Sequence, residues 1–357
     1  LRYMINLQIN QKNITFMSQY NLNNLDAAQN RYILGIDLLA RNFFEEAKAM
    51  LKTAIEQGQD TPKAMYAIGD ILIRQDKLDE AEEWLQKAIN NSINASYPPA
   101  LRALGFILLK RDQLEGATAA FNKAIEQADN YFPEAWLDLG ITLSKQKLFE
   151  EAEAAVLESI KQERVPDNSP EAWYNLGLIL LADEKKLDEA RIALETSLEQ
   201  QETREVKFSL GKVMYKLGDS MLNTQKFVEA IEYYNQAILH RNGNYHEAQY
   251  KIGNALFGLD RYDDAIESYK EAIRQKGGKF PSANFSIAQT MMYQGNFYEA
   301  EHYFKIAIDE KNDQYPFEKQ LIELDLDFGD YSSALQRIEV YNDPEDALRI
   351  AYCWYKS

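Results

Sequence analysis

The chain has 357 residues and a formal net charge of −17, with 46% hydrophobic and 27% charged residues. Its length suits several ordinary domains or one long repeat array, and no long apolar run predicts a membrane-spanning segment. One cysteine and three histidines exclude a disulfide scaffold and a zinc site built on several cysteines, and the acidic balance disfavours a nucleic-acid-binding protein, which needs a basic face. We therefore predict a protein of the reducing cytoplasm that contacts other proteins.

The two ends of the chain differ from the rest. Residues 1–24 are predicted to be a lead-in segment that is extended or irregular, and no signal-peptide pattern follows Leu1. Residues 342–357 have the pattern of an amphipathic helix that stops without a cap or turn. Both ends lead us to expect a fragment of a longer chain.

Between these ends a motif recurs at nearly constant spacing. Its landmark alanine, preceded by an acidic residue in most copies, lies at Ala47, Ala81, Ala117, Ala152, Ala190, Ala230, Ala265 and Ala300. A glycine lies twelve residues before most of these alanines, and Ala288 replaces it in the last copy. Apolar residues in each copy form two stripes with helical spacing, separated by a short polar break. Such a short break predicts an antiparallel helical hairpin.

Helix ends are marked by local signals. Prolines indicate starts of the first helices at Pro62, Pro98, Pro133, Pro170 and Pro281, where the missing N–H is not needed. Acidic residues begin most second helices, as in Asp79-Glu80 and Asp263-Asp264. We interpret these acids as stabilising partners of the helix dipole.

The pattern resembles the tetratricopeptide repeat, or TPR. A first helix of the form W-x2-L-G-x2-(Y/L) is matched by Trp136, Leu139, Gly140 and Leu143, and the second helix begins with Ala152. The resemblance covers residues 25–310 in eight units, followed by a degenerate ninth unit at 311–341 and the first helix of a truncated unit at 342–357. It implies an all-α fold, a right-handed α-solenoid of tandem antiparallel helix hairpins, with a concave groove along the TPR superhelix.

The sixth unit departs from the pattern. Gly211 and Gly218 are seven residues apart, and apolar residues continue in helical phase through both glycines. We predict a first helix that is lengthened by about two turns. The lengthening is either a tolerated insertion or an added docking surface.

The resemblance implies that positions 5, 9 and 12 of each first helix, counted with the recurring glycine as position 8, line the groove. Tyrosine is frequent there and is a good interface residue. The candidate partner-binding residues, at or beside these positions, are Tyr66, Asp70, Arg74, Arg102, Lys110, Lys145, Tyr174, Tyr215, Asp219, Tyr250, Asn254, Phe257, Phe285, Gln289 and Tyr293. Alternatively, these rings pack against the neighbouring first helix inside the array.

Charge is distributed unevenly. A small basic set, Arg74, Arg102, Lys110 and Lys145, would receive an acidic peptide, or else consists of solvated ends of long side chains. Residues 299–346 carry fourteen acidic residues against four basic ones. This stretch would steer a basic partner, or it is simply a solubilising end.

No motif for chemistry is present: there is no Gly-rich phosphate loop, His-Glu-x-x-His pair or nucleophile elbow. We predict no enzyme activity, no cofactor and no metal. The predicted function is a protein–protein interaction scaffold or adaptor whose groove holds a segment of a protein or peptide partner within a multi-subunit assembly. It would neither bind nucleic acid nor insert into a membrane, and self-association is left open. The alternatives are a targeting or regulatory array of a larger enzyme and an assembly factor of a membrane complex.

Overall fold

The computed structural model describes residues 27–58, 61–162 and 169–310, together with single positions between 322 and 337. In these residues it contains sixteen α-helices and one short 3-10 helix, and no strand. The predicted lead-in segment and the truncated last unit lie outside the described residues. The degenerate ninth unit does too, except for those single positions.

The chain divides into two compact bodies, an N-terminal body of residues 1–182 and a C-terminal body of residues 183–357. The helices of the N-terminal body are α2 (Ala27–Ala40), α3 (Phe44–Glu56), α4 (Thr61–Arg74), α5 (Leu78–Asn90), η1 (Ile93–Ala95), α6 (Pro98–Lys110), α7 (Leu114–Gln127), α8 (Pro133–Lys145), α9 (Phe149–Gln162) and α10 (Pro170–Asp183). Those of the C-terminal body are α11 (Leu187–Gln200), α12 (Arg204–Asn223), α13 (Phe227–His240), α14 (His246–Gly258), α15 (Tyr262–Gln275), α16 (Pro281–Tyr293) and α17 (Phe297–Glu310).

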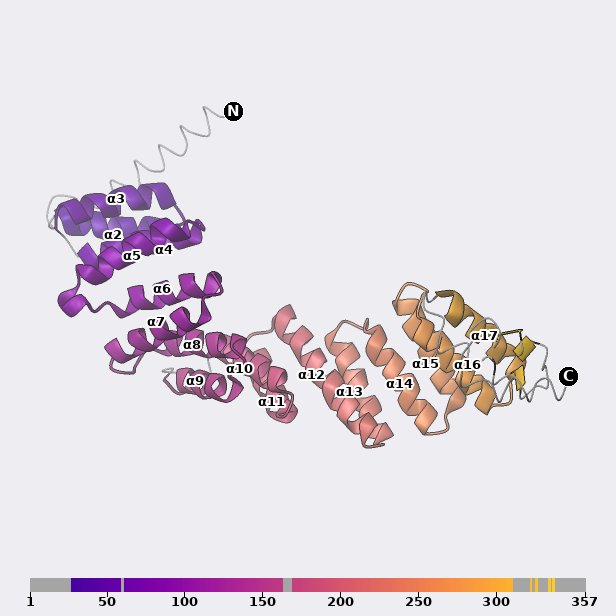
Figure 1. Cartoon of the computed structure of the whole chain (residues 1–357). Coiled ribbons are helices and arrows are strands. Elements are labelled where there is room, and N and C mark those ends of the chain that lie inside the picture. The colour runs from indigo at the N-terminus through magenta and orange to yellow at the C-terminus, as the bar shows by residue number, and fades with distance from the viewer. Residues whose placement is uncertain are drawn as a thin grey trace, which may run out of the picture. The chain divides into compact units, whose positions relative to one another are not determined.

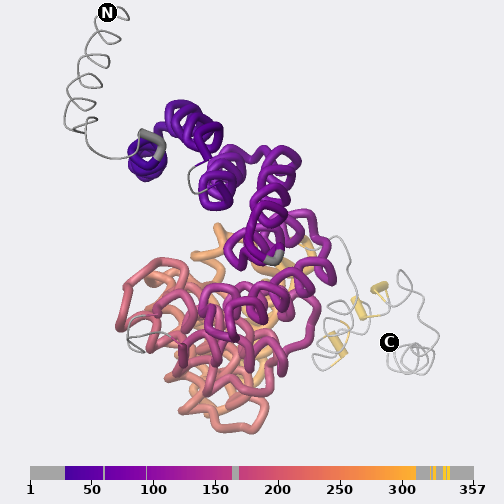
Figure 2. Tube along the Cα trace, turned by 90° about the vertical axis from the view of Figure 1, so that its left-hand side faces the viewer, coloured from indigo at the N-terminus to yellow at the C-terminus, as the bar shows by residue number. Residues whose placement is uncertain are grey.

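Within each body, consecutive helices pair as antiparallel hairpins (Figure 1). In the N-terminal body α2 packs on α3, α4 on α5, α6 on α7 and α8 on α9, and each of α3, α5 and α7 also packs on the first helix of the next hairpin. In the C-terminal body α12 pairs with α13, α14 with α15 and α16 with α17. The trace in Figure 2 shows the same succession of neighbouring helices. The predicted all-α fold of tandem helix hairpins is confirmed.

Each hairpin turn contains one residue in the left-handed conformation. In the α4–α5 turn Asp76 has φ 59°, its amide donates to Ile73 O at 2.9 Å, and Lys77 N donates to Leu72 O at 2.9 Å. These bonds satisfy carbonyls that the end of α4 would leave unpaired. The equivalent positions are Asn42, Asp112, Lys147, Glu184, Gln225, Asp260 and Gly295. Asn and Asp tolerate this conformation better than other non-glycine residues, which explains why four of the turns use them.

Four first helices follow an aromatic residue in an extended conformation. These residues are Tyr97, Phe132, Tyr245 and Phe280, with φ between −142° and −154°. Three of them precede a proline, which disfavours the helical region for the residue before it. The extended backbone therefore ends one hairpin, and the predicted helix starts at Pro98, Pro133, Pro170 and Pro281 are confirmed.

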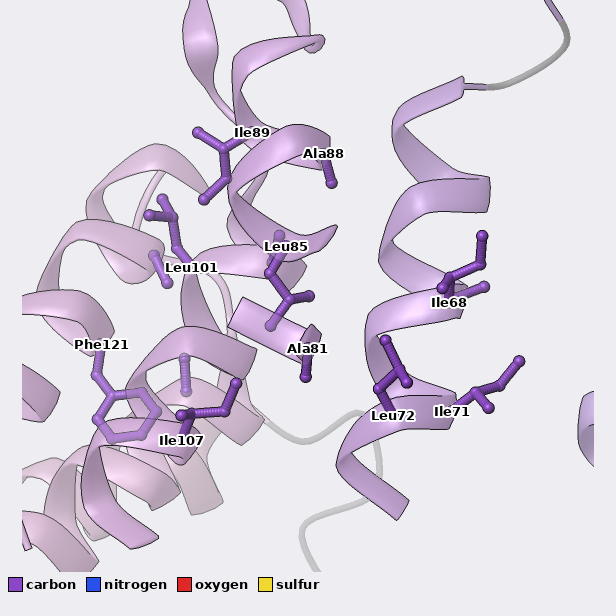
Figure 3. Packing of buried hydrophobic residues seen from close by; sticks show 14 of the residues in the cluster. Ile68, Ile71, Leu72, Ala81, Leu85, Ala88, Ile89, Leu101, Ile107 and Phe121 are labelled. Atoms are coloured by element: carbon purple, nitrogen blue, oxygen red, sulfur yellow. The ribbon is translucent and has the colours of Figure 1, made fainter. Parts of the chain in front are cut away.

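The core of each hairpin lies where the second helix crosses the recurring glycine. In the N-terminal body a Cβ added to Gly105 would lie 2.6 Å from the ring of Phe121, and one added to Gly140 would lie 2.4 Å from Val156 Cγ2. Figure 3 shows Ala81 and Leu85 on the side of α5 that faces α4. The small residues therefore allow bulky side chains to fill the gap between the helices.

The sixth hairpin confirms the predicted long first helix, because α12 has 20 residues. Thr203 Oγ1 accepts from Val206 N at 3.2 Å and caps the helix. The added turns pack inward: Val206 and Leu210 are buried, and a Cβ on Gly211 would lie 3.2 Å from Ala237 O of α13. The insertion thus enlarges the contact between α12 and α13.

Polar side chains also connect successive hairpins. Gln75, just after α4, donates to Glu45 of α3 at 3.2 Å, and Gln294, just after α16, donates to Asp263 of α15 at 2.8 Å. Arg111 makes the equivalent contact to Asp79 at 2.5 Å. The acidic first turns therefore bridge adjacent hairpins, in addition to the dipole role expected for them.

Candidate partner-binding groove

A pocket of about 260 Å³ lies between three successive first helices, and two of them, α4 and α6, line it with predicted groove positions. It is lined by Tyr66, Asp70 and Ile73 of α4, Pro99, Arg102, Ala103 and Phe106 of α6, and Asp138 of α8. Tyr66 and Arg102 hold position 5, Asp70 and Phe106 hold position 9, and Ile73 holds position 12. Residues 36 apart in sequence, such as Arg102 and Asp138, are thus brought to one hollow because the hairpins stack in register.

Ion pairs line this pocket. Arg102 Nε donates to Asp138 Oδ2 at 2.6 Å, and Asp70 pairs with Arg74 of the same helix at 3.0 Å. Burial raises the pKa of the Asp138 carboxyl above its ordinary value, and the Arg102 guanidinium opposes that shift. Burial also raises the pKa of Tyr66. The pocket therefore offers a phenol, an apolar floor and a partly exposed ion pair.

The predicted basic set is largely neutralised by the chain itself. Besides the pairs of Arg74 and Arg102, Lys110 Nζ donates to Asp76 at 3.3 Å and lies 5.6 Å from the centre of the Phe106 ring. Lys145 is exposed at the end of α8 and has no partner among the described residues. This surface consequently presents little free positive charge.

The position-5 rings of the C-terminal body pack inside the array. Tyr215 lies 5.7 Å from Tyr234 of α13 and 5.2 Å from Tyr245, measured between ring centres. Tyr250 repeats this arrangement at 5.5 Å from Tyr269 and 5.2 Å from Phe280, and its hydroxyl shares a hydrogen bond of 3.1 Å with Ser286. Each ring is therefore held between its own second helix and the residue before the next first helix.

The remaining position-5 residues differ in their surroundings. Phe285 contacts Phe304 at 5.4 Å, and Tyr66 contacts Tyr97 at 5.8 Å. Tyr174 is half-buried on α10. The contacts of Tyr66, Tyr215, Tyr250 and Phe285 are those expected for packing within the array, so their exposed edges alone would face a partner.

In two hairpins of the C-terminal body the polar residue at position 9 accepts a hydrogen bond from a tyrosine of the second helix. Tyr234 Oη donates to Asp219 at 2.7 Å, and Lys251 Nζ lies 3.0 Å from the same carboxylate. Tyr269 Oη donates to Asn254 Oδ1 at 2.9 Å. Burial raises the pKa of Tyr234 and of Tyr269 well above the ordinary value. Gln289, at the equivalent place on α16, is half-buried.

A further aromatic group lies at two neighbouring hairpin turns, and we call Phe257, Tyr262 and Tyr293 the aromatic rim. Ring centres are 5.1 Å apart for Phe257 and Tyr293, 5.6 Å for Phe257 and Tyr262, and 6.2 Å for Tyr262 and Tyr293. Tyr293 is 69% exposed. Sequence reasoning included Phe257 and Tyr293 but missed Tyr262 and also missed Asp138. An aromatic residue directly after the Asp260-Arg261 turn was the available signal for Tyr262.

A second hollow, of about 570 Å³, lies along α14 and α15 and contains none of the predicted groove residues. Four of its charged residues form pairs within α15 or at its start, Arg261 with Asp264 at 2.7 Å and Arg274 with Glu271 at 2.5 Å. Among the described residues, no group of three His, Cys, Asp or Glu side chains could hold a metal ion. No helix in the described part of the chain has the length and apolarity needed to cross a membrane.

Comparison with known proteins agrees with the repeat geometry. A family model described as tetratricopeptide repeat matches residues 32–100, 102–169, 137–204 and 215–282. The C-terminal part of a TPR repeat-containing protein from Cytophaga hutchinsonii is similar over 80% of this chain and 97% of its own length, with 14% identity and a TM-score of 0.47.

Two further solved structures are similar over shorter stretches. YrrB, described as a TPR protein with an unusual peptide-binding site, is 23% identical over 55% of this chain and 94% of its own, with a TM-score of 0.40. PilF of Pseudomonas aeruginosa is 18% identical over 63% of this chain and 97% of its own, with a TM-score of 0.42. No curated protein matches the chain.

Proposed function

The chain belongs to the tetratricopeptide repeat family, and on that premise we propose that it is a non-catalytic scaffold or adaptor. Its first helices hold an extended segment of a partner protein, within an assembly of several subunits. The binding surface is the row formed by positions 5, 9 and 12, and it includes the pocket between α4, α6 and α8.

The observation that carries this proposal is the convergence of three first helices on one hollow. Its volume of about 260 Å³ is slightly below the range of about 300–1,000 Å³ that is usual for small-molecule sites. A hollow of this size suits one or two side chains of a longer ligand. The Phe106 ring and Ile73 supply apolar contact, while the Arg102–Asp138 pair supplies a donor and an acceptor for a polar group.

The polar groups in the pocket favour a segment with mixed chemistry over a purely acidic one. Two carboxylates, Asp70 and Asp138, face one guanidinium in the lining, and Arg74 is already paired with Asp70. An acidic side chain entering here would approach these carboxylates at short range and be repelled. An apolar or aromatic side chain flanked by backbone amides is the ligand that this lining supports.

Photo-crosslinking tests the proposal. A photoreactive amino acid replaces Ile73 in the pocket, and in a matched control it replaces Lys123, which is exposed on α7. Crosslinking in the cells of origin is followed by mass spectrometry of the adducts. We expect the Ile73 position to give adducts with one short segment of one partner and Lys123 to give none with that segment. Equal adducts from the two positions would contradict groove binding.

A further inference from the structure

The aromatic rim combines one exposed ring, that of Tyr293, with the half-buried rings of Phe257 and Tyr262. Tyr293 is 69% exposed, and Tyr298 of the same turn region is 81% exposed. Tyr262 and Tyr293 are stacked with an interplanar angle of 28°, and Phe257 meets Tyr293 edge-on at 81°. The three rings hold one another in place, so the exposed ring face is preorganised rather than mobile on its own.

Carboxylates border these rings. Tyr262 Oη donates to Asp260 at 2.7 Å, and Asp263 accepts from Gln294, the neighbour of Tyr293, at 2.8 Å. The nearest arginine in sequence, Arg261, is paired with Asp264 at 2.7 Å. Asp260 and Asp263 have no cationic partner among the described residues. Their carboxylates thus lie beside the electron-rich faces of the rings.

Elsewhere the chain places its own cations over aromatic rings, which are half-buried or, for Phe280, buried. Lys87 lies 4.8 Å from the centre of the Trp84 ring, Lys110 lies 5.6 Å from Phe106, and Lys276 lies 3.9 Å from Phe280. Among the described residues no lysine or arginine lies over a ring of the aromatic rim. The rim therefore combines the chemistry that attracts a cation with the absence of one from its surroundings.

We propose that the aromatic rim binds an arginine side chain of the partner segment, which stacks on Tyr293 and Tyr262 and pairs with Asp260 or Asp263. This inference rests on the proposed function, because Phe257 and Tyr293 belong to the groove, and it names one feature of the partner. Arginine fits better than lysine because its guanidinium is planar, weakly hydrated and able to stack on a ring while donating to a carboxylate.

The chain contains an internal example of the same contact. The guanidinium carbon of Arg241 lies 4.0 Å from the centre of the Phe208 ring and 3.8 Å from that of Tyr245. There the rings and the arginine come from one body, and the contact holds the lengthened α12 against the end of α13. At the rim the rings are present, and the partner supplies the arginine.

Peptide binding tests the proposal. The probe is a blocked, fluorescently labelled peptide of alternating glycine and arginine, compared with matched peptides in which lysine, citrulline or proline replaces arginine. Citrulline keeps the planar shape of arginine without its charge. Anisotropy titrations with the full chain at physiological salt should give the tightest binding to the arginine peptide and at least tenfold weaker binding to the citrulline peptide.

Matched variants separate the rim from bulk charge, since any basic peptide is attracted to a protein of net charge −17. The double variant Tyr262→Leu with Tyr293→Leu removes the rings at constant net charge and should weaken arginine-peptide binding about tenfold. Asp260→Asn with Asp263→Asn keeps both hydrogen-bond acceptors and should weaken it about fivefold. Tyr131→Leu, which removes a 56% exposed ring from the N-terminal body, should leave the affinity unchanged.

Three results would overturn the proposal. Unchanged arginine-peptide affinity in the ring variant would mean that net charge alone attracts the probe. Equal affinity for the lysine peptide would remove the assignment to arginine, and preference for the proline peptide would indicate a polyproline partner instead. Each of these results leaves the crosslinks from Ile73 unaffected, because that residue lies in the other body. A failure of the rim is thereby distinguished from a failure of the groove.

Discussion

The two bodies of this protein fill the space over the recurring glycine with different side chains. In the N-terminal body the residue over the glycine is apolar, as in Leu51, Leu85, Phe121 and Val156. In the C-terminal body Tyr234 lies over Gly218 and Tyr269 over Gly253. All six of these contacts place a side-chain atom within 3.0 Å of where a Cβ would be, so the helices approach equally closely in both bodies.

This difference accounts for two polar residues of the groove, Asp219 and Asn254. A buried tyrosine hydroxyl needs a hydrogen-bond partner, and the residue after the glycine provides it, Asp219 for Tyr234 and Asn254 for Tyr269. Where the covering residue is Phe121, the corresponding groove residue is the apolar Phe106. In these two hairpins a buried tyrosine on the second helix is thus matched by an acceptor on the first helix, although a polar residue also occurs after Gly69, where Leu85 is the covering residue.

The largest expected difference between the bodies is in alkali. Because burial raises the pKa of Tyr234 and Tyr269 above 10, the fold favours their neutral form; their contribution to stability is complete below pH 10 and is lost as the pH rises toward the folded pKa. The loss of both contributions should lower the free energy of unfolding by about 4 kcal/mol at pH 11.5, relative to its value below pH 10.

Hydrogen exchange at pH 8 to 11.5, resolved by peptide, checks this result, with α13 and α15 losing protection before α5 and α7. The double variant Tyr234→Phe with Tyr269→Phe serves as a control and should reduce the pH dependence without abolishing it, because burial also raises the pKa of Tyr215 and Tyr245 in this body. Equal loss of protection in both bodies would contradict the comparison.

Substituting the glycine itself should have the next largest effect. In Gly140→Leu the new Cβ meets Val156 Cγ2 at 2.4 Å and the backbone oxygen of Ala152 at 3.0 Å, and that backbone cannot move without breaking helix contacts. We expect a loss of about 3 kcal/mol in the free energy of unfolding, measured by urea denaturation. In Gly253→Leu the close atoms belong to the Tyr269 ring, so a smaller loss is expected.

The control for this pair is Gly116→Ala. Gly116 is on α7, and its added Cβ would lie 3.4 Å from Leu108 Cδ1, an ordinary contact. Alanine is the better helix former, so this variant should be neutral or slightly stabilised. An unfolding midpoint unchanged by Gly140→Leu would refute the alignment of the repeats.

Exchanging the residue that covers the glycine should give a hairpin of the N-terminal body the tyrosine and acceptor found in the C-terminal body. Phe121→Tyr places a hydroxyl over Gly105 where Phe106 offers no acceptor, and we expect a loss of about 2 kcal/mol. Adding Phe106→Asn should recover part of this loss, because it recreates the spacing of Asn254 and Tyr269. A double-mutant cycle from denaturation measurements gives the coupling energy. Zero coupling would show that the pairing does not transfer between the bodies.

The smallest effect concerns a contact that both bodies share. Gln75→Ala and Gln294→Ala each remove one exposed bond to the preceding hairpin, to Glu45 and Asp263 respectively. Each should lower the free energy of unfolding by no more than about 0.5 kcal/mol, since solvent replaces the lost bond. Thermal denaturation of the two variants should show nearly equal shifts of the melting temperature. A large difference between the shifts would mean that the two bodies do not share this contact energetically.

Much of the fold could be predicted from particular residues. The spacing of Gly105 and Ala117 and the apolar stripes around them predicted the hairpins, and the continuous phase through Gly211 and Gly218 predicted the long α12. Tyr66, Arg102 and Phe106, which belong to the predicted groove positions, line one pocket. These predictions succeeded because they depend on distances along a single helix, which the helical period determines.

The candidate site could be predicted only in part. Sequence reasoning left open whether the position-5 tyrosines meet a partner or the array, and the structure shows Tyr250 held between Tyr269 and Phe280. It missed the pairing of Arg102 with Asp138, 36 residues away, and the inclusion of Tyr262 in the aromatic rim. Contacts of this kind join different hairpins, so the helical period carries no information about them.

The sequence by itself therefore determined the helix pairs, their small crossing residues and the row of side chains along the first helices, because local periodicity leaves one way to bury the apolar stripes. The tertiary structure alone decided which polar and aromatic groups meet across that row. Tyr269 reaches Asn254 and Phe257 reaches Tyr293 only after two helices or two hairpins have packed at a set distance and register. Side-chain hydrogen bonds and ring contacts act over a few ångströms, so such pairs exist only once packing has brought them within that range.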